Sequence, residues 1–131
     1  MAKRHAPSLM RQIRRELKKG ASPESIFLKV KAIEDPYYRS LSFFLLIPYL
    51  SPKDKRCKES ISLSNKDIEK VQQPWRRVEL LGSISKILKS VPDLRLKRQL
   101  FSLILEKIRI EKSTEIKDFL LKYTKNFPES Y

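Results

Sequence analysis

The residues of this chain with the clearest chemical potential are its cations, and they are densest near the N-terminus. Residues 1–20 hold seven basic side chains against Glu16 alone. Cations crowded along a helix repel one another, and an array of phosphates reverses that repulsion by releasing counterions. The sequence therefore predicts a polyanion-binding segment made of Lys3, Arg4, Arg11, Arg14, Arg15, Lys18 and Lys19. The alternative is a solvated helix face, docked on the domain by its apolar side.

A second basic patch is predicted around positions 51–64, joined by two arginines that follow the only tryptophan. It comprises Lys53, Lys55, Arg56, Lys58, Arg76 and Arg77. An exposed Trp75 would give this patch a platform on which bases stack. Trp75 comes one position after a helix-starting proline, however, and Tyr37 has the same placement. An aromatic residue there usually packs against the neighbouring helix, so we expect Trp75 in the core.

A third basic group lies on the very apolar segment between 94 and 110. Its members are Arg95, Arg98 and Arg109. If only this polar wedge meets solvent, it would form a groove for an extended polyanion. Gln99 and Glu106 lie in the same arc, so ion pairs within the helix explain the wedge equally well.

Residues suited to catalysis or metal binding are scarce. His5 is the only histidine, and Cys57 is the only cysteine. The neighbouring cations would lower the pKa of the Cys57 thiol, but an incidental surface thiol is the simpler interpretation. Metal-ligand spacings, a phosphate-cradling glycine loop and a nucleophile elbow are all absent. We therefore expect no enzymatic activity, no cofactor and no metal site.

Composition points to a single compact domain with an anionic partner. The 131 residues include 29 Lys and Arg against 15 Asp and Glu, which gives a net charge of +14. Such an excess destabilises a compact state by self-repulsion unless something negative lies opposite. The lone cysteine rules out an internal disulfide and favours an intracellular location, in cytoplasm, nucleus or nucleoid. The longest apolar run, Leu41 to Leu50, is too short to span a bilayer.

The elements that must hold these cations are all predicted to be helices. Only two glycines occur, which leaves few sites for tight hairpins. Apolar spacing and helix-starting prolines predict an all-α fold of six or seven helices. They span about 8–20, 22–33, 35–50, 65–72, 74–91, 92–110 and 113–127. The predicted organisation is a basic leader over 1–7, a single helical domain over 8–128 and a tail over 129–131. The segment from 51 to 64 is expected to be an exposed basic loop, and the helix over 92–110 to be central.

The chain also echoes itself at an offset of 38 residues. The matched pairs are Val30 with Ile68, Ile33 with Val71, Pro36-Tyr37 with Pro74-Trp75, Arg39 with Arg77, Phe43 with Leu81, Leu46 with Ile84, and Leu50 with Leu88. Such an echo predicts stacked helix pairs, each burying a face that it cannot bury alone. The alternative is an irregular helical bundle.

Two segments of this echo, Asp35 to Arg39 and Pro74 to Gly82, resemble the opening helix of a HEAT repeat. The resemblance covers about residues 35–127, or two and a half repeats. It implies a short right-handed α-solenoid that serves as a binding surface for nucleic acids or proteins. Phe43 to Leu46 are bulkier than the small residues of that family, and 51–64 is a poor second helix.

These observations predict a non-catalytic nucleic-acid-binding subunit or accessory factor of a larger complex, with low sequence specificity. RNA and DNA are not distinguished, because basic patches do not read the sugar. The first alternative is an α-solenoid protein scaffold whose concave face grips an acidic or apolar partner segment, with any exposed part of the run Leu41 to Leu50 contributing. Attachment of the first helix to an anionic membrane ranks third, because that helix carries no Trp or Phe.

Overall fold

The chain is all-helical, as the sequence predicts. A computed structural model describes residues 6–111 and 114–122. These residues form seven α-helices and one 3-10 turn, with no strand among them. Lys3, Arg4, His5 and Phe127 lie outside the described residues. The chain divides into two compact units at the boundary between Lys70 and Val71. The sequence predicts one helical domain over 8–128.

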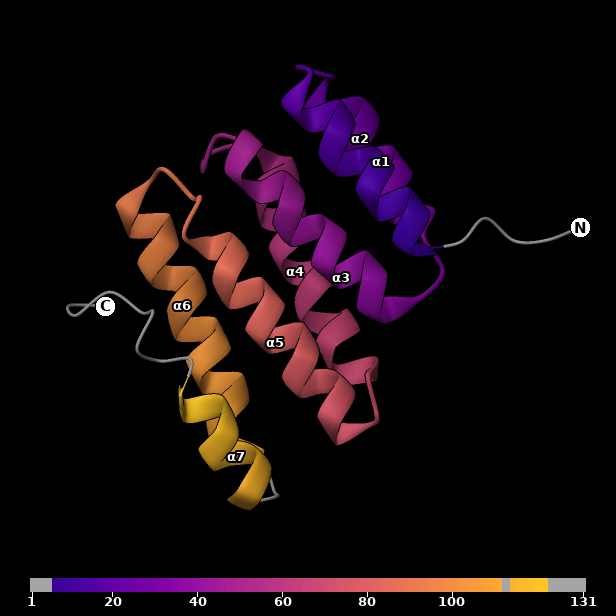
Figure 1. The fold of residues 1–131 in the computed structure, drawn as a ribbon. Coiled ribbons are helices and arrows are strands. Elements are labelled where there is room, and N and C mark those ends of the chain that lie inside the picture. Colours follow the sequence, from indigo (N-terminus) through magenta and orange to yellow (C-terminus); the bar gives the residue numbers. More distant parts are fainter. Residues whose placement is uncertain (1–5, 112–113, 123–131) are drawn as a thin grey trace, which may run out of the picture. The chain divides into compact units, whose positions relative to one another are not determined.

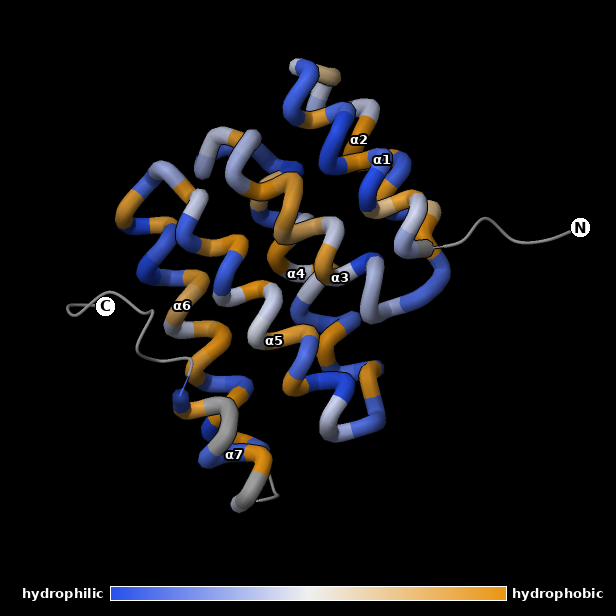
Figure 2. Tube along the Cα trace, in the orientation of Figure 1, coloured by the Kyte–Doolittle hydropathy of each residue, from blue (hydrophilic) through white to orange (hydrophobic). Residues whose placement is uncertain are grey.

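The first unit contains four α-helices, of which α3 makes the most contacts. Its elements are α1 (Ala6–Lys18), α2 (Pro23–Lys31), α3 (Pro36–Leu46), the 3-10 turn η1 (Ile47–Tyr49) and α4 (Lys55–Lys70) (Figure 1). Helix α3 packs against α1, α2 and α4. Its residues from Ser40 to Leu46 are all buried, and Figure 2 shows it as mostly apolar or neutral. The core of this unit therefore forms around α3.

Local sequence signals set the ends of these helices. Gly20 adopts φ +88°, a conformation that ends α1 and that few side chains tolerate. The Asp35 side chain accepts a hydrogen bond from the Tyr37 N–H at 2.9 Å and so caps α3. Pro48 ends α3 as a 3-10 turn. Ser22 precedes α2 as predicted, but its side chain makes no capping hydrogen bond.

Helix α4 corrects the prediction of an irregular basic loop over 51–64. Lys55, Arg56 and Lys58 lie on its first turn. Its buried face consists largely of small or polar side chains: Cys57, Ser60, Ser64, Asp67 and Ile68. The Ser40 hydroxyl of α3 donates to the Ser64 carbonyl oxygen at 3.3 Å, so α3 and α4 lie close together. A face with so few large apolar residues gives little hydrophobic periodicity, and the sequence pattern therefore indicates only the second half of this helix, within the predicted segment 65–72.

The second unit contains α5 (Pro74–Leu88), α6 (Leu94–Arg109) and α7 (Thr114–Leu121), which contact one another (Figure 1). Asp93 caps α6 by accepting from the Leu96 N–H at 2.8 Å. Leu100 and Ile104 of α6 are fully buried, as are Leu80 and Ile84 of α5. Exposed Leu94 and Ile110 mark the two ends of α6, so α3 and not α6 is the most thoroughly buried helix.

Trp75 does not lie in the core, contrary to expectation. Its side chain is 53% exposed at the start of α5, whereas the matching Tyr37 is 7% exposed. Trp75 and Tyr37 occupy equivalent positions in the sequence echo, but only Tyr37 is buried. Within residues 6–111 and 114–122, no helix combines the length and apolar character that a membrane crossing needs.

Candidate nucleic-acid interface

The candidate interface is one face of α1, and the opposite face of that helix anchors it. Ile13 and Leu17 are 2% and 4% exposed, and they fix α1 in a unit where it contacts α2 and α3. Leu9 and Met10 are half-buried on the same side. Because this apolar stripe is already covered, the side of α1 that remains for a partner is its polar side.

That polar side carries five exposed cations within nine consecutive positions. They are Arg11, Arg14, Arg15, Lys18 and Lys19, called the α1 basic face below. None of the five forms an ion pair with another described residue. The Arg11 guanidinium donates only a long hydrogen bond, 3.4 Å, to the Ser8 hydroxyl. The predicted cations of this helix are therefore gathered on one surface, and carboxylates do not neutralise them.

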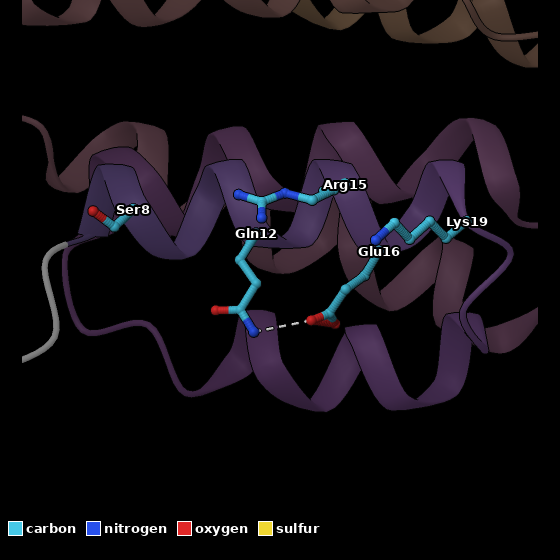
Figure 3. A pocket seen from close by; sticks show the side chains of 5 residues that line it. All are labelled: Ser8, Gln12, Arg15, Glu16 and Lys19. Atoms are coloured by element: carbon cyan, nitrogen blue, oxygen red, sulfur yellow. Dashed lines mark hydrogen bonds between the residues drawn. The ribbon is translucent and has the colours of Figure 1, made fainter.

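The single carboxylate of α1, Glu16, lies beside the α1 basic face and is already paired. The Glu16 carboxylate accepts a hydrogen bond from the Gln12 amide at 2.9 Å, and it forms an ion pair with Lys29 of α2 at 2.7 Å. In Figure 3 the Gln12 and Glu16 side chains reach toward a neighbouring helix, while the Arg15 and Lys19 side chains extend along α1. Lys29 thus offsets the only negative charge on the helix, and the five cations keep their net positive potential.

A shallow hollow of about 440 Å³ opens on this side of α1 (Figure 3). It is lined by Ser8, Gln12, Arg15, Glu16 and Lys19. Its lining combines two cations, Arg15 and Lys19, with a hydroxyl, an amide and the paired Glu16 carboxylate, so its chemistry suits a hydrated polar group rather than an apolar ligand.

The second predicted patch is only partly available. Lys53, Lys55 and Lys58 are exposed near the start of α4. Arg56 is engaged with Asp54, whose carboxylate accepts from the Arg56 backbone N–H at 2.8 Å and from its guanidinium at 3.1 Å. These hydrogen bonds hold the pKa of Asp54 below its usual value. Arg56 therefore stabilises the start of α4, and three lysines remain for a partner.

The arginines after Trp75 belong to the second unit, and one of them has a structural role. The Arg77 guanidinium pairs with Glu111 at 3.1 Å and donates to the Val71 carbonyl oxygen at 2.8 Å. The Glu111 side chain is only 6% exposed, so the pair is largely shielded from water. Arg77 is therefore committed to holding its unit together. Arg76 is half-buried beside it.

The third predicted group is spread along α6. Arg95 is exposed near the start of the helix, Arg98 is half-buried, and Arg109 is exposed at the end. Arg95 and Arg109 are separated by about 21 Å along the axis at 1.5 Å per residue. Arg109 lies 3.9 Å from Glu106, which agrees with the ion pair that the sequence left open. These three arginines do not form one compact site.

Cys57 is buried and not a surface thiol. It is 1% exposed, and burial followed by the nearby Asp54 charge raises its pKa. The neighbouring cations do not activate it, contrary to the effect considered from sequence. Among residues 6–111 and 114–122, no three His, Cys, Asp or Glu side chains converge as a metal site would require.

Comparisons with known proteins found no relative of this chain. No family model, curated protein or solved structure matches the chain.

The sequence did not reveal the acidic partners that join helices within the chain. Asp67 binds Arg39, Glu111 binds Arg77, and Asp54 caps α4. The Asp54 signal is readable, since an aspartate one position before a helix is a common cap. Asp67 and Glu111 lie 28 and 34 residues from their arginines, and no local pattern reveals such distant pairs.

Proposed function

We propose that this protein is a non-catalytic nucleic-acid-binding subunit or accessory factor that contacts phosphates through the α1 basic face. The observation that supports this most directly is the group of five exposed cations without a carboxylate partner among the described residues. The role belongs inside the cell, where nucleic acids lie. RNA and DNA remain equivalent candidates, because phosphates are common to both.

The energetics of α1 favour a polyanion as the occupant of this face. Like charges three or four positions apart on a helix each cost a few tenths of a kcal/mol, and α1 contains several such pairs. Phosphates turn this cost into a gain, because each neutralised contact releases condensed counterions. Guanidinium groups also bind phosphate oxygens bidentately, and three of the five cations are arginines.

An anionic membrane is a weaker candidate for the same face. Amphipathic helices bind bilayers by burying their apolar side among acyl chains. In α1 that side is covered within its own unit, with Ile13 only 2% exposed. Lipid headgroups would meet the cations alone, without the apolar contribution that such helices use.

A protein scaffold built on the run Leu41 to Leu50 also loses its main support. Phe43 and Phe44 are 0% exposed, and only Tyr49 projects into solvent from this run. The exposed large apolar residues of the described chain are single positions well separated in the sequence: Leu28, Tyr49, Trp75, Leu94, Ile110 and Leu121. Single exposed apolar residues are ordinary on protein surfaces.

We also propose that the helix pairs α3–α4 and α5–α6 are two copies of one repeat of the HEAT type. Arg39 and Arg77 are matched in the sequence echo and make equivalent contacts. Each pairs with an acidic residue, and each donates to the carbonyl oxygen six positions before it, that of Ile33 or Val71. A shared and uncommon contact set favours repetition over an irregular bundle.

The test of nucleic-acid binding compares two triple variants, one that removes three positive charges from α1 and one that removes three from other parts of the chain. The first variant is Arg11→Ala, Arg14→Ala, Arg15→Ala. The matched control is Lys66→Ala, Lys86→Ala, Lys89→Ala, which removes the same charge from exposed positions of α4 and α5 and the turn after α5. Affinity for duplex DNA and structured RNA is measured by fluorescence anisotropy at fixed salt.

We expect the α1 variant to lose at least about tenfold in affinity and the control to lose much less. Equal losses would mean that net charge alone draws the ligand, and the α1 basic face would not be the interface. Unmeasurable binding of the wild-type protein to both nucleic acids would overturn the proposed function.

A further inference from the structure

We infer that the α1 basic face recognises double-stranded nucleic acid in preference to a single strand. This inference rests on the proposed function and names the form of the ligand. It follows from what the face contains, what it lacks and how densely its charges are set.

The charge density of the face matches a duplex better than one strand. From Arg11 to Lys19 the helix rises about 12 Å, at 1.5 Å per residue. A duplex presents one phosphate charge per about 1.7 Å of axis, or about seven over that length. A single strand at duplex rise presents about half as many. Over this length a duplex therefore supplies more phosphate charge than the five cations carry, whereas one strand supplies less and leaves some cations unmatched and mutually repelled.

The face also lacks the side chains by which single strands are usually held. Single-strand binding sites place aromatic rings under successive bases. No residue of α1 is aromatic. In the same unit Phe27, Tyr37, Phe43 and Phe44 are buried, and the exposed ring of Tyr49 belongs to η1 and not to α1. Bases splayed from a single strand would meet aliphatic stems and guanidinium planes here, without the aromatic rings that usually hold them.

The neutral polar side chains on this side of α1 are partly engaged. The Gln12 amide donates to Glu16 at 2.9 Å, and the Ser8 hydroxyl accepts from Arg11 at 3.4 Å. The remaining groups are guanidinium and ammonium donors on a helix held by buried Ile13 and Leu17. Such a rigid row of donors suits the fixed phosphate spacing of a duplex, with little dependence on sequence.

The test compares a short DNA duplex, the equivalent RNA duplex and an unstructured single strand with the same number of phosphates. The full chain is titrated against each at one salt concentration, as are the two triple variants described above. We expect either duplex to bind about tenfold more tightly than the single strand, and the α1 variant to abolish most of that preference. The two duplexes show whether the sugar matters.

The outcomes separate this inference from the proposed function. If the single strand binds as tightly as the duplexes and the α1 variant weakens all three, nucleic-acid binding stands and the duplex preference is wrong. The duplex preference is also wrong if the single strand binds more tightly and Trp75→Ala removes that binding, because the exposed tryptophan then supplies a stacking site. If the wild-type protein binds none of the three, both proposals fall.

Discussion

Arg39 and Asp67, 28 residues apart in the chain, form a two-pronged ion pair that joins α3 to α4. The guanidinium donates to both carboxylate oxygens, at 2.8 and 2.7 Å, and also to the Ile33 carbonyl oxygen at 3.1 Å. This hydrogen bonding with Asp67 raises the pKa of the arginine. The Asp67 side chain is only 3% exposed, so a charge buried on α4 depends on its partner on α3.

Removal of Arg39 should destabilise the first unit strongly. Arg39→Ala would leave the buried Asp67 carboxylate with only Lys70, whose ammonium lies 3.8 Å away. Breaking a buried pair from one side costs about 3–5 kcal/mol, and the cost here lies toward the lower end because the Arg39 side chain is 23% exposed. Urea denaturation followed by circular dichroism measures the loss. Lys66→Ala, an exposed change on α4, should stay within about 0.5 kcal/mol.

A double variant distinguishes an ion pair from simple packing. Arg39→Leu together with Asp67→Leu removes both charges, and it should recover part of the stability that Arg39→Ala loses. A double variant as unstable as the sum of the two single changes would contradict this assignment.

The equivalent pair in the second unit should act locally. Arg77→Ala would deprive Glu111 of its partner and free the carbonyl oxygens of Val71 and Gln72. Hydrogen exchange should then quicken for amides near the start of α5 and the end of α6, with α3 and α4 little changed. Uniform loss of protection over both units, or none in α5 and α6, would show that the contact does not have this role.

Neutralising the α1 basic face should stabilise the folded protein. Arg11, Arg14, Arg15, Lys18 and Lys19 form several like-charged pairs at helical spacing. Replacing the three arginines by alanine removes that repulsion and keeps a strong helix former, a gain of about 0.5–1 kcal/mol. Differential scanning calorimetry at low salt should show a higher Tm. A lower Tm would mean that these arginines contribute to the fold rather than to a partner.

The Cys57 thiol should be protected from alkylation while α4 is folded. Burial raises its pKa, so at pH 8 the folded protein holds the thiol proton and offers little thiolate. The unfolded chain releases that proton near pH 8.5, and stability therefore falls as pH rises above this value. Mass spectrometry after iodoacetamide treatment should find modification in urea and very little without it. Rapid labelling of the native protein would place Cys57 at the surface.

The fold class and most helix starts follow from the sequence, because prolines and apolar periodicity are local signals. Pro36, Pro74 and Asp93 stand within one position of helix starts, and Gly20 follows the end of α1. Helix α4 was missed over its first half, since its buried face carries Cys57, Ser60 and Ser64 rather than large apolar residues. A hydropathy scale measures how favourably a side chain leaves water for an apolar environment. It carries no information on how closely small polar side chains pack together.

The sequence allows the candidate site to be predicted only where basic residues fall on one side of a helix, opposite its apolar residues. The arc of α1 opposite Ile13 and Leu17 follows from spacing alone, and its residues are exposed as expected. Arg56 and Arg77 have the same local sequence signal as binding arginines. Their carboxylate partners, Asp54 and Glu111, are fixed by the folded chain, and this separates structural arginines from available ones.

The most direct test of phosphate binding by α1 is the salt dependence of duplex affinity. The logarithm of the binding constant should fall against the logarithm of salt concentration with a slope of about −4 for the wild-type protein. Loss of Arg11, Arg14 and Arg15 should make the slope shallower by about 2–3, since each phosphate contact contributes about 0.9. A slope that is the same in the wild-type protein and this triple variant would contradict the assignment of the α1 basic face as the nucleic-acid interface.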